Sequence, residues 1–137
     1  MLNRQRKIRG ATLIELMGSV LVFMIGIAAL IGVYLQSVTA ARRADLFYIS
    51  YNLAKNHVET LKTISFSNLS SAAEVSSPIN QDGVPDLGGD FLRTTTVSTS
   101  YSGDANLTQV MVGIKYKMKG AWSVAPVELT TVIANLT

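Results

Sequence analysis

The sequence predicts an α+β protein in which a long N-terminal helix packs on a C-terminal antiparallel β-meander. Residues 16–35 are uncharged and apolar, and residues 36–66 continue without proline or glycine. After residue 90, apolar residues recur at every second position over several stretches. A long helical region followed by a strand period indicates one helix and then a sheet, which can bury their apolar faces against each other.

The first predicted element is an apolar helix over residues 11–35. Within it, residues 16–35 are twenty uncharged positions that match the hydrocarbon core of a bilayer, about 30 Å thick, at a rise of about 1.5 Å per residue. Basic residues precede it and none follows until Arg42, which predicts a cytoplasmic N-terminus and an extracytoplasmic domain. A secretory signal has an apolar region of only about 7 to 15 residues. The sequence therefore favours a membrane-spanning segment over an ordinary secretory signal.

The second predicted element is an amphipathic helix over residues 36–66. Its apolar residues recur at spacings of three to five and form one stripe: Leu46, Ile49, Leu53, Val58, Leu61 and Ile64. The solvated face carries charged residues: Asp45, Lys55, Glu59 and Lys62. Such a stripe is typical of a helix that packs on a soluble core. His57, the only histidine, is expected on the helix surface.

The rest of the chain is predicted to be a long loop and a sheet. Residues 67–90 are rich in serine, asparagine, glycine and proline and show neither period, so they indicate a connecting loop. The sheet domain, residues 91–137, holds three predicted strands at 91–101, 108–120 and 127–136. The connections between them are short enough for hairpins, which makes a meander the simplest arrangement.

Composition narrows the possible functions. The net charge is +3, but four of the twelve basic side chains lie in the first ten residues, which leaves eight basic against nine acidic side chains elsewhere. The chain has no cysteine, so a disulfide framework or a thiolate site is excluded. No nucleophile elbow and no glycine-rich phosphate loop after a strand is present. The sequence predicts neither an enzyme nor a cofactor.

Glu15 is the only charged residue between Arg9 and Arg42. A carboxylate is expensive in lipid-like surroundings, so this one needs a favourable position or a partner. One such position is the first turn of a helix at the level of the lipid headgroups, where the helix dipole favours negative charge. The other possibility is a cationic partner that is buried with it among apolar helices.

The stretch RGATLIEL, residues 9–16, with the basic residues before it and the uncharged run after it, resembles the signal of type IV prepilins and type II secretion pseudopilins. The resemblance implies that a prepilin peptidase cuts after Gly10 and that the new N-terminal Ala11 is methylated. It also implies a filament in which the apolar helices bundle centrally, while Glu15 neutralises the N-terminal amine of a neighbouring subunit. The expected partners are other pilin subunits, the peptidase and, before assembly, the bacterial inner membrane.

Residues 52–69, NLAKNHVETLKTISFSNL, resemble the PilV-type minor pilins and the related pseudopilins. The resulting hypothesis is a minor pilin that acts in pilus assembly or at the pilus tip. A type II secretion pseudopilin is the runner-up, because the helices and leaders of the two groups have the same sequence pattern and the same physical properties. A permanently anchored single-pass protein that binds a ligand outside the cell is the alternative from a different class.

Three glycines, Gly18, Gly26 and Gly32, interrupt the apolar helix. Each costs about 1 kcal/mol relative to alanine in a helix interior. They are expected to permit close helix packing, as Ala28 and Gly32 four residues apart would, or to mark a place where the helix loosens. Packing is the favoured interpretation.

Two further patterns suggest ligands. The loop residues Asn80, Asp82, Asp86 and Asp90 offer oxygen ligands that suit calcium, although the same residues are ordinary turn formers. Lys115, Lys117 and Lys119, with Arg93 as an addition, form a basic row that suits contact with DNA or with a surface ligand in an adhesive role. Protection of an exposed sheet edge by lysine is the commoner explanation of such a row.

Overall fold

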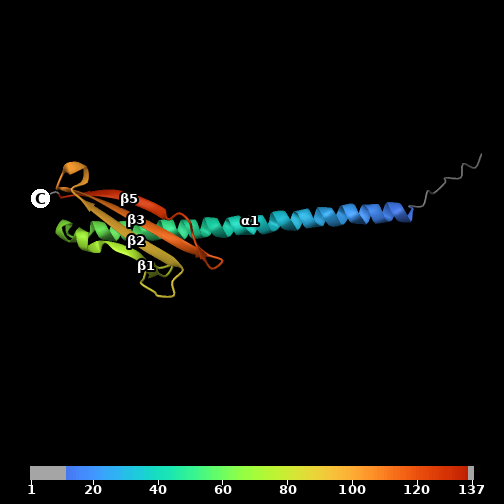
Figure 1. Ribbon diagram of the computed structural model, residues 1–137, viewed down its shortest axis with the longest axis horizontal. Coiled ribbons are helices and arrows are strands. Elements are labelled where there is room, and N and C mark those ends of the chain that lie inside the picture. The colour runs from blue at the N-terminus through green and yellow to red at the C-terminus, as the bar shows by residue number, and fades with distance from the viewer. Residues whose placement is uncertain (1–11, 136–137) are drawn as a thin grey trace, which may run out of the picture. The chain divides into compact units, whose positions relative to one another are not determined.

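The computed structural model describes residues 12–135 and confirms the predicted α+β fold. The described residues form one long helix, two short 3₁₀ helices and five strands (Figure 1). Their bounds are α1 Leu13–Lys62, η1 Phe66–Ala72, β1 Glu74–Ile79, β2 Phe91–Thr99, η2 Tyr101–Gly103, β3 Leu107–Met118, β4 Ala121–Trp122 and β5 Val127–Ala134. The chain divides into two compact units, one up to Ala41 and one from Arg42 onward.

The first unit consists, in its described part, of the apolar half of α1. All side chains from Thr12 to Ser37 are exposed, including a phenylalanine, a tyrosine and many aliphatic residues. By length and composition α1 is able to cross a membrane. An apolar helix with no covered face within its own chain needs a lipid or protein environment, because water exposure of this much apolar surface is unfavourable.

The second unit contains an antiparallel sheet in which the long strands follow chain order. β1 pairs with β2, β2 with β3, and β3 with both β4 and β5. Phe91 faces Tyr116 across the β2–β3 ladder, and Ile114 faces Val127 across the β3–β5 ladder. β4 pairs with β3 at Lys117 and Met118, just past the part of β3 that pairs with β5. β4 and β5 are therefore two parts of the same arm, the segment that follows β3 and runs back along it. The predicted meander of three long strands is confirmed.

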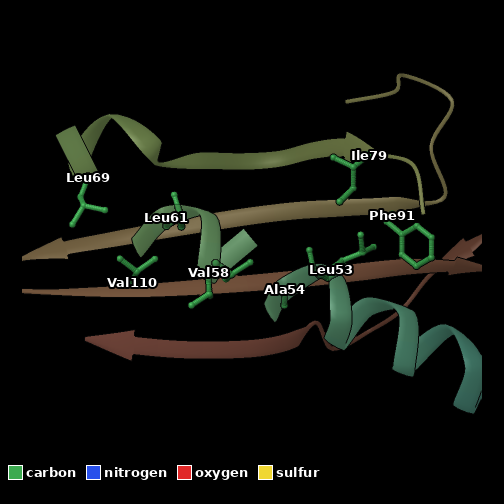
Figure 2. Packing of buried hydrophobic residues seen from close by; sticks show 10 residues of the cluster. Leu53, Ala54, Val58, Leu61, Leu69, Ile79, Phe91 and Val110 are labelled. Atoms are coloured by element: carbon green, nitrogen blue, oxygen red, sulfur yellow. The ribbon is translucent and has the colours of Figure 1, made fainter. Parts of the chain in front are cut away.

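The core of the second unit lies between the sheet and the amphipathic half of α1. Leu53, Ala54, Val58 and Leu61 of α1 point toward the sheet (Figure 2). Facing residues come from η1, β1, β2 and β3: Leu69, Ile79, Phe91, Val110, Val112 and Ile114. The predicted stripe is confirmed, since its remaining members Leu46, Ile49 and Ile64 pack against this cluster. On β3 the buried residues alternate with more exposed ones from Leu107 to Val112, as a half-buried strand requires.

The prediction of an unstructured loop over residues 67–90 is wrong for its first half. That segment contains most of η1 and all of β1, and the helix ends at Lys62 rather than near residue 66. Composition misled the prediction because clusters of serine are typical of loops and proline is rare in strand interiors. The β1–β2 pairing is irregular between Glu74 and Ser77, which breaks the period-two pattern that identifies strands. Residues 80–90 connect β1 to β2.

Gly89 occupies a position in this connection where no other residue fits. A Cβ atom at this position would lie 2.1 Å from the carbonyl oxygen of Ile79, whereas one at Gly88 would meet only a carboxylate oxygen of Asp86 at 3.6 Å. We expect Gly89→Ala to lower the free energy of unfolding by about 2–3 kcal/mol, because the backbone must move to relieve the overlap. Urea unfolding of the full chain in detergent, with Gly88→Ala as the control, tests this. Equal effects of the two substitutions would contradict it.

Candidate functional site

Glu15 lies in the first turn of α1. Thr12 precedes the helix, its carbonyl oxygen accepts the N–H groups of Glu15 and Leu16 at 3.0 and 3.1 Å, and its N–H donates to Oε2 of Glu15 at 3.4 Å. This last bond is one half of a capping box, in which an acidic or amide side chain in the first turn accepts the N–H of the cap residue. The Glu15 side chain is exposed within its own chain, so its carboxylate is open to a partner. Gly10 and Ala11 lie outside the described residues.

The three glycines of the apolar helix share one side of it. At about 100° per residue, Gly18, Gly26 and Gly32 fall within about a third of the helix circumference, and Glu15 falls within the same third. A Cβ atom at any of the three glycines would meet nothing within 4 Å. Contacts within the chain therefore do not account for the glycines. Small residues on one side allow another helix to approach closely, so the packing role stays a prediction.

In the predicted calcium loop, side-chain oxygen atoms accept hydrogen bonds from backbone N–H groups of the same loop. Oδ1 of Asn80 accepts the N–H groups of Asp82 and Val84 at 2.9 and 3.0 Å, and Oδ1 of Asp86 accepts the N–H of Gly88 at 2.9 Å. Asp90 and Asp82 line a hollow of about 280 Å³ beside these turns. Within residues 12–135 no three histidine or acidic side chains converge as a metal site would require. The arrangement matches the turn-forming interpretation.

The basic row is shorter than predicted. Lys115 and Lys117 lie on the outer face of β3, but Lys119 lies in the turn after the strand, with a φ of 53°. Nζ of Lys117 lies 5.7 Å from the ring centroid of Trp122, a cation–π distance. Arg93 does not join the row, because it points to the inner face of the sheet and pairs with Glu74.

That pair belongs to a polar cluster between α1 and the sheet, formed by His57, Glu74, Arg93 and Thr95. The guanidinium of Arg93 donates from Nε and Nη2 to the two carboxylate oxygens of Glu74, and from Nη1 to the carbonyl oxygen of Gly83 at 3.3 Å. Oγ1 of Thr95 donates to Oε1 of Glu74 at 3.2 Å. A two-pronged arginine–carboxylate pair of this kind fixes orientation as well as adding energy. The cluster thereby ties β1 to β2.

His57 completes the cluster from the helix. Its Nε2 lies 3.2 Å from Oγ1 of Thr95 and 3.4 Å from Oε1 of Glu74. Its side chain is only 17% exposed, so the expectation of a surface histidine is wrong. The helical stripe did not reveal this, because the space that His57 fills depends on polar residues of two strands.

The surroundings in the cluster shift the pKa values of His57 and Glu74. Burial, followed by the charge of Arg93, lowers the pKa of His57 below its ordinary value of 6.5, although Glu74 acts in the opposite direction. Burial tends to raise the pKa of Glu74, but hydrogen bonds and charge from Arg93, with hydrogen bonds from Ser77 and Thr95, lower it below 4.5. At neutral pH the cluster therefore holds a neutral imidazole beside a charged ion pair.

One sequence pattern could have revealed part of the cluster. Arg93 and Thr95 alternate with the same period as Phe91 and Val97, so all four share the inner face of β2. A charged residue at such a position requires a buried partner. The partner, Glu74, could not be found from the sequence because its strand was not predicted.

We expect the free energy of unfolding to fall as the pH decreases from about 7.5 to about 5. The folded state binds fewer protons than the unfolded state below pH 6.5, because the pKa of His57 is lower when folded. This contribution is complete above pH 6.5 and is lost as the pH falls below it. Glu74 acts in a separate window, below pH 4.5. Urea titrations at several pH values should show a flatter profile for His57→Gln, and an unchanged slope would contradict this prediction.

No protein family, curated protein or solved structure matches this chain.

Proposed function

We propose that this protein is a structural subunit of a type IV pilus-like filament, a minor pilin that acts in pilus assembly or at the pilus tip. The observation that carries the proposal is the apolar half of α1, with Glu15 in its first turn and no side chain from Thr12 to Ser37 covered by its own chain. Such a helix suits two environments in turn: the bilayer before assembly and the centre of a helical bundle afterwards. The α+β unit after Arg42 supplies a folded domain for the filament surface.

The role of Glu15 follows from the cost of burying charge. Cleavage after Gly10 leaves a cationic amine on Ala11, and that amine must be neutralised if it enters an apolar bundle. An unpaired buried charge costs several kcal/mol, whereas a buried pair with good geometry is tolerated. Glu15 of one subunit would therefore accept the amine of its neighbour and set the axial position of the helix. Its exposed carboxylate supports this proposal, and the shared side with three glycines supports close approach of another helix.

In this proposal the chain first resides in the inner membrane, with its N-terminus in the cytoplasm and the second unit, here called the β-domain, outside. A prepilin peptidase removes residues 1–10, Ala11 is methylated, and the mature subunit enters the filament. Fractionation of the native host tests the proposal. Mechanically sheared filaments should contain the chain, and a strain that makes no filaments should retain it in the membrane. Its absence from sheared filaments, with all of it in the membrane of both strains, would overturn the proposal.

The runner-up, a type II secretion pseudopilin, shares the fold and processing, and differs in the machine that the filament serves. Deletion of the chain separates the two, since a pilus subunit affects surface filaments and a pseudopilin affects export of secreted proteins. A permanently anchored ligand-binding protein would leave both processes intact.

A further inference from the structure

A groove of about 470 Å³ lies between the start of the second unit's helix and the arm that follows β3. Arg43 and Phe47 line it from α1, Tyr116 from β3, Trp122 from β4, and Val124 from the segment before β5. Phe47, Trp122 and Val124 are all exposed, and Val124 is 99% exposed. The groove therefore presents aromatic and aliphatic groups to the surroundings, with an arginine at its side.

Arg43 lines this groove, and three further basic side chains belong to residues next to its lining residues; the four are here called its basic border. Arg42 adjoins Arg43 on α1, Lys117 lies against the ring of Trp122, and Lys119 occupies the turn between β3 and β4; all four basic side chains are exposed.

Three acidic residues lie close to this border in the fold, and one of them, Glu128, directly follows Val127, which lines the groove. Asp45 follows Arg43 by two positions on α1, and the carbonyl oxygen of Asp90 accepts the N–H of Lys117 at 2.8 Å. Four cations against three anions leave a positive excess of one charge around an apolar centre. That combination suits an anionic, amphipathic surface.

The position of the groove along the chain identifies such a surface. Arg42 is the first charged residue after the uncharged run, and Arg43 already lines the groove. When the apolar run crosses a bilayer, these arginines are the first charged residues at its outer boundary. Tryptophan, tyrosine, arginine and lysine are the residues that favour this headgroup zone.

We propose that the groove with its basic border is a membrane-contact surface. It binds anionic phospholipid headgroups on the outer side of the bilayer, the side on which the β-domain lies. The proposal rests on the membrane-anchored stage of the proposed function and adds a role for the β-domain at that stage. The domain lies on the lipid surface through Trp122, Val124 and the four basic side chains, so its departure into a filament requires release from lipid.

The neighbouring loop provides a contrast. Residues 80–90 lie at the same end of the sheet as the β3–β4 turn (Figure 1). Leu87 in this loop is 98% exposed, as fully as Val124. However, it stands next to Asp86 and near Asp82 and Asp90, which anionic headgroups repel. The charges thus assign lipid contact to the arm that carries Val124 and not to the loop that carries Leu87.

Trp122 is the only tryptophan of the chain, so its fluorescence reports on this groove alone. The full chain is reconstituted at a low protein-to-lipid ratio into phosphatidylcholine vesicles with increasing fractions of phosphatidylglycerol. Quenching is measured with lipids that carry a spin label near the headgroup or deep in the acyl chain. We expect the shallow label to quench Trp122 more than the deep one, and the quenching to increase with the phosphatidylglycerol fraction.

Two matched variants test the charge argument. Val124→Asp should lose about half or more of the lipid quenching, since a carboxylate is disfavoured at an anionic lipid interface. Leu87→Asp places the same charge at an equally exposed position and should retain the wild-type quenching. Both positions are fully exposed, so neither substitution disturbs the core. Equal loss in the two variants would overturn the assignment of the contact to the groove.

Vesicle flotation separates this inference from the proposed function. If the chain floats with vesicles but Trp122 is not quenched by either lipid label, the membrane-contact surface is wrong and the anchoring stands. If the chain does not float, both are wrong. If quenching of Trp122 by the lipid labels falls as the density of the chain in the membrane rises, and does not change with the phosphatidylglycerol fraction, a second copy covers the groove. That result would overturn the lipid proposal.

Discussion

Glu15→Gln should reduce the amount of this chain in sheared filaments about a hundredfold or more, while the chain still reaches the membrane and is cleaved. In the proposed filament the substitution leaves the amine of Ala11 without a countercharge, and an unpaired buried charge costs about 3–5 kcal/mol. Glutamine keeps the size of the side chain and can still accept the N–H of Thr12, as the capping box requires. The variant therefore removes the charge and preserves the helix cap.

Quantitative immunoblots of filament and membrane fractions measure this effect. Glu59→Gln is the control, because Glu59 is an exposed glutamate of the same helix whose partner Lys62 lies 2.9 Å away on the surface. Surface ion pairs of this kind contribute little, about 1 kcal/mol or less. Wild-type filament levels of the Glu15→Gln variant would show that Glu15 serves only as a helix cap.

Leu61→Ala should lower the free energy of unfolding of the second unit by about 3 kcal/mol. Leu61 is 2% exposed and belongs to the cluster that joins α1 to the sheet. Removing its methyl groups leaves a cavity in a region that cannot collapse easily, since the helix and the strands hold its walls apart.

Urea unfolding of the full chain in detergent, followed by the fluorescence of Trp122, measures this loss. Leu87→Ala is the matched control at a fully exposed leucine and should change the free energy of unfolding by less than about 0.5 kcal/mol. A loss below about 1 kcal/mol for Leu61→Ala would mean that the helix–sheet interface is not the stabilising core.

The predictable parts of this fold are those with a strong local pattern. The apolar run and the stripe from Leu46 to Ile64 each repeat over many residues, so the helix and its buried face were predicted closely. Val110, Val112 and Ile114 are apolar residues at every second position, which identified β3 and its inner face. Their structure depends mainly on residues within the same element.

The unpredicted parts depend on partners far away in the sequence. β1 contains serines, Pro78 and an irregular pairing, and it is a strand because β2 offers hydrogen bonds along its edge. The polar cluster joins His57, Glu74 and Arg93 from three elements, so no local pattern reveals it. The groove around Trp122 similarly combines a helix start with a strand end that lies about eighty residues later in the chain.

The central claim is that this chain is processed as a filament subunit, and the mass of its N-terminal peptide from the native host tests it most directly. The measurement compares strains with and without an active prepilin peptidase. We predict a peptide that begins at methylated Ala11 when the peptidase is active, and an uncut leader through Gly10 when it is not. An uncut leader in both strains would contradict the filament function and leave a membrane-anchored domain.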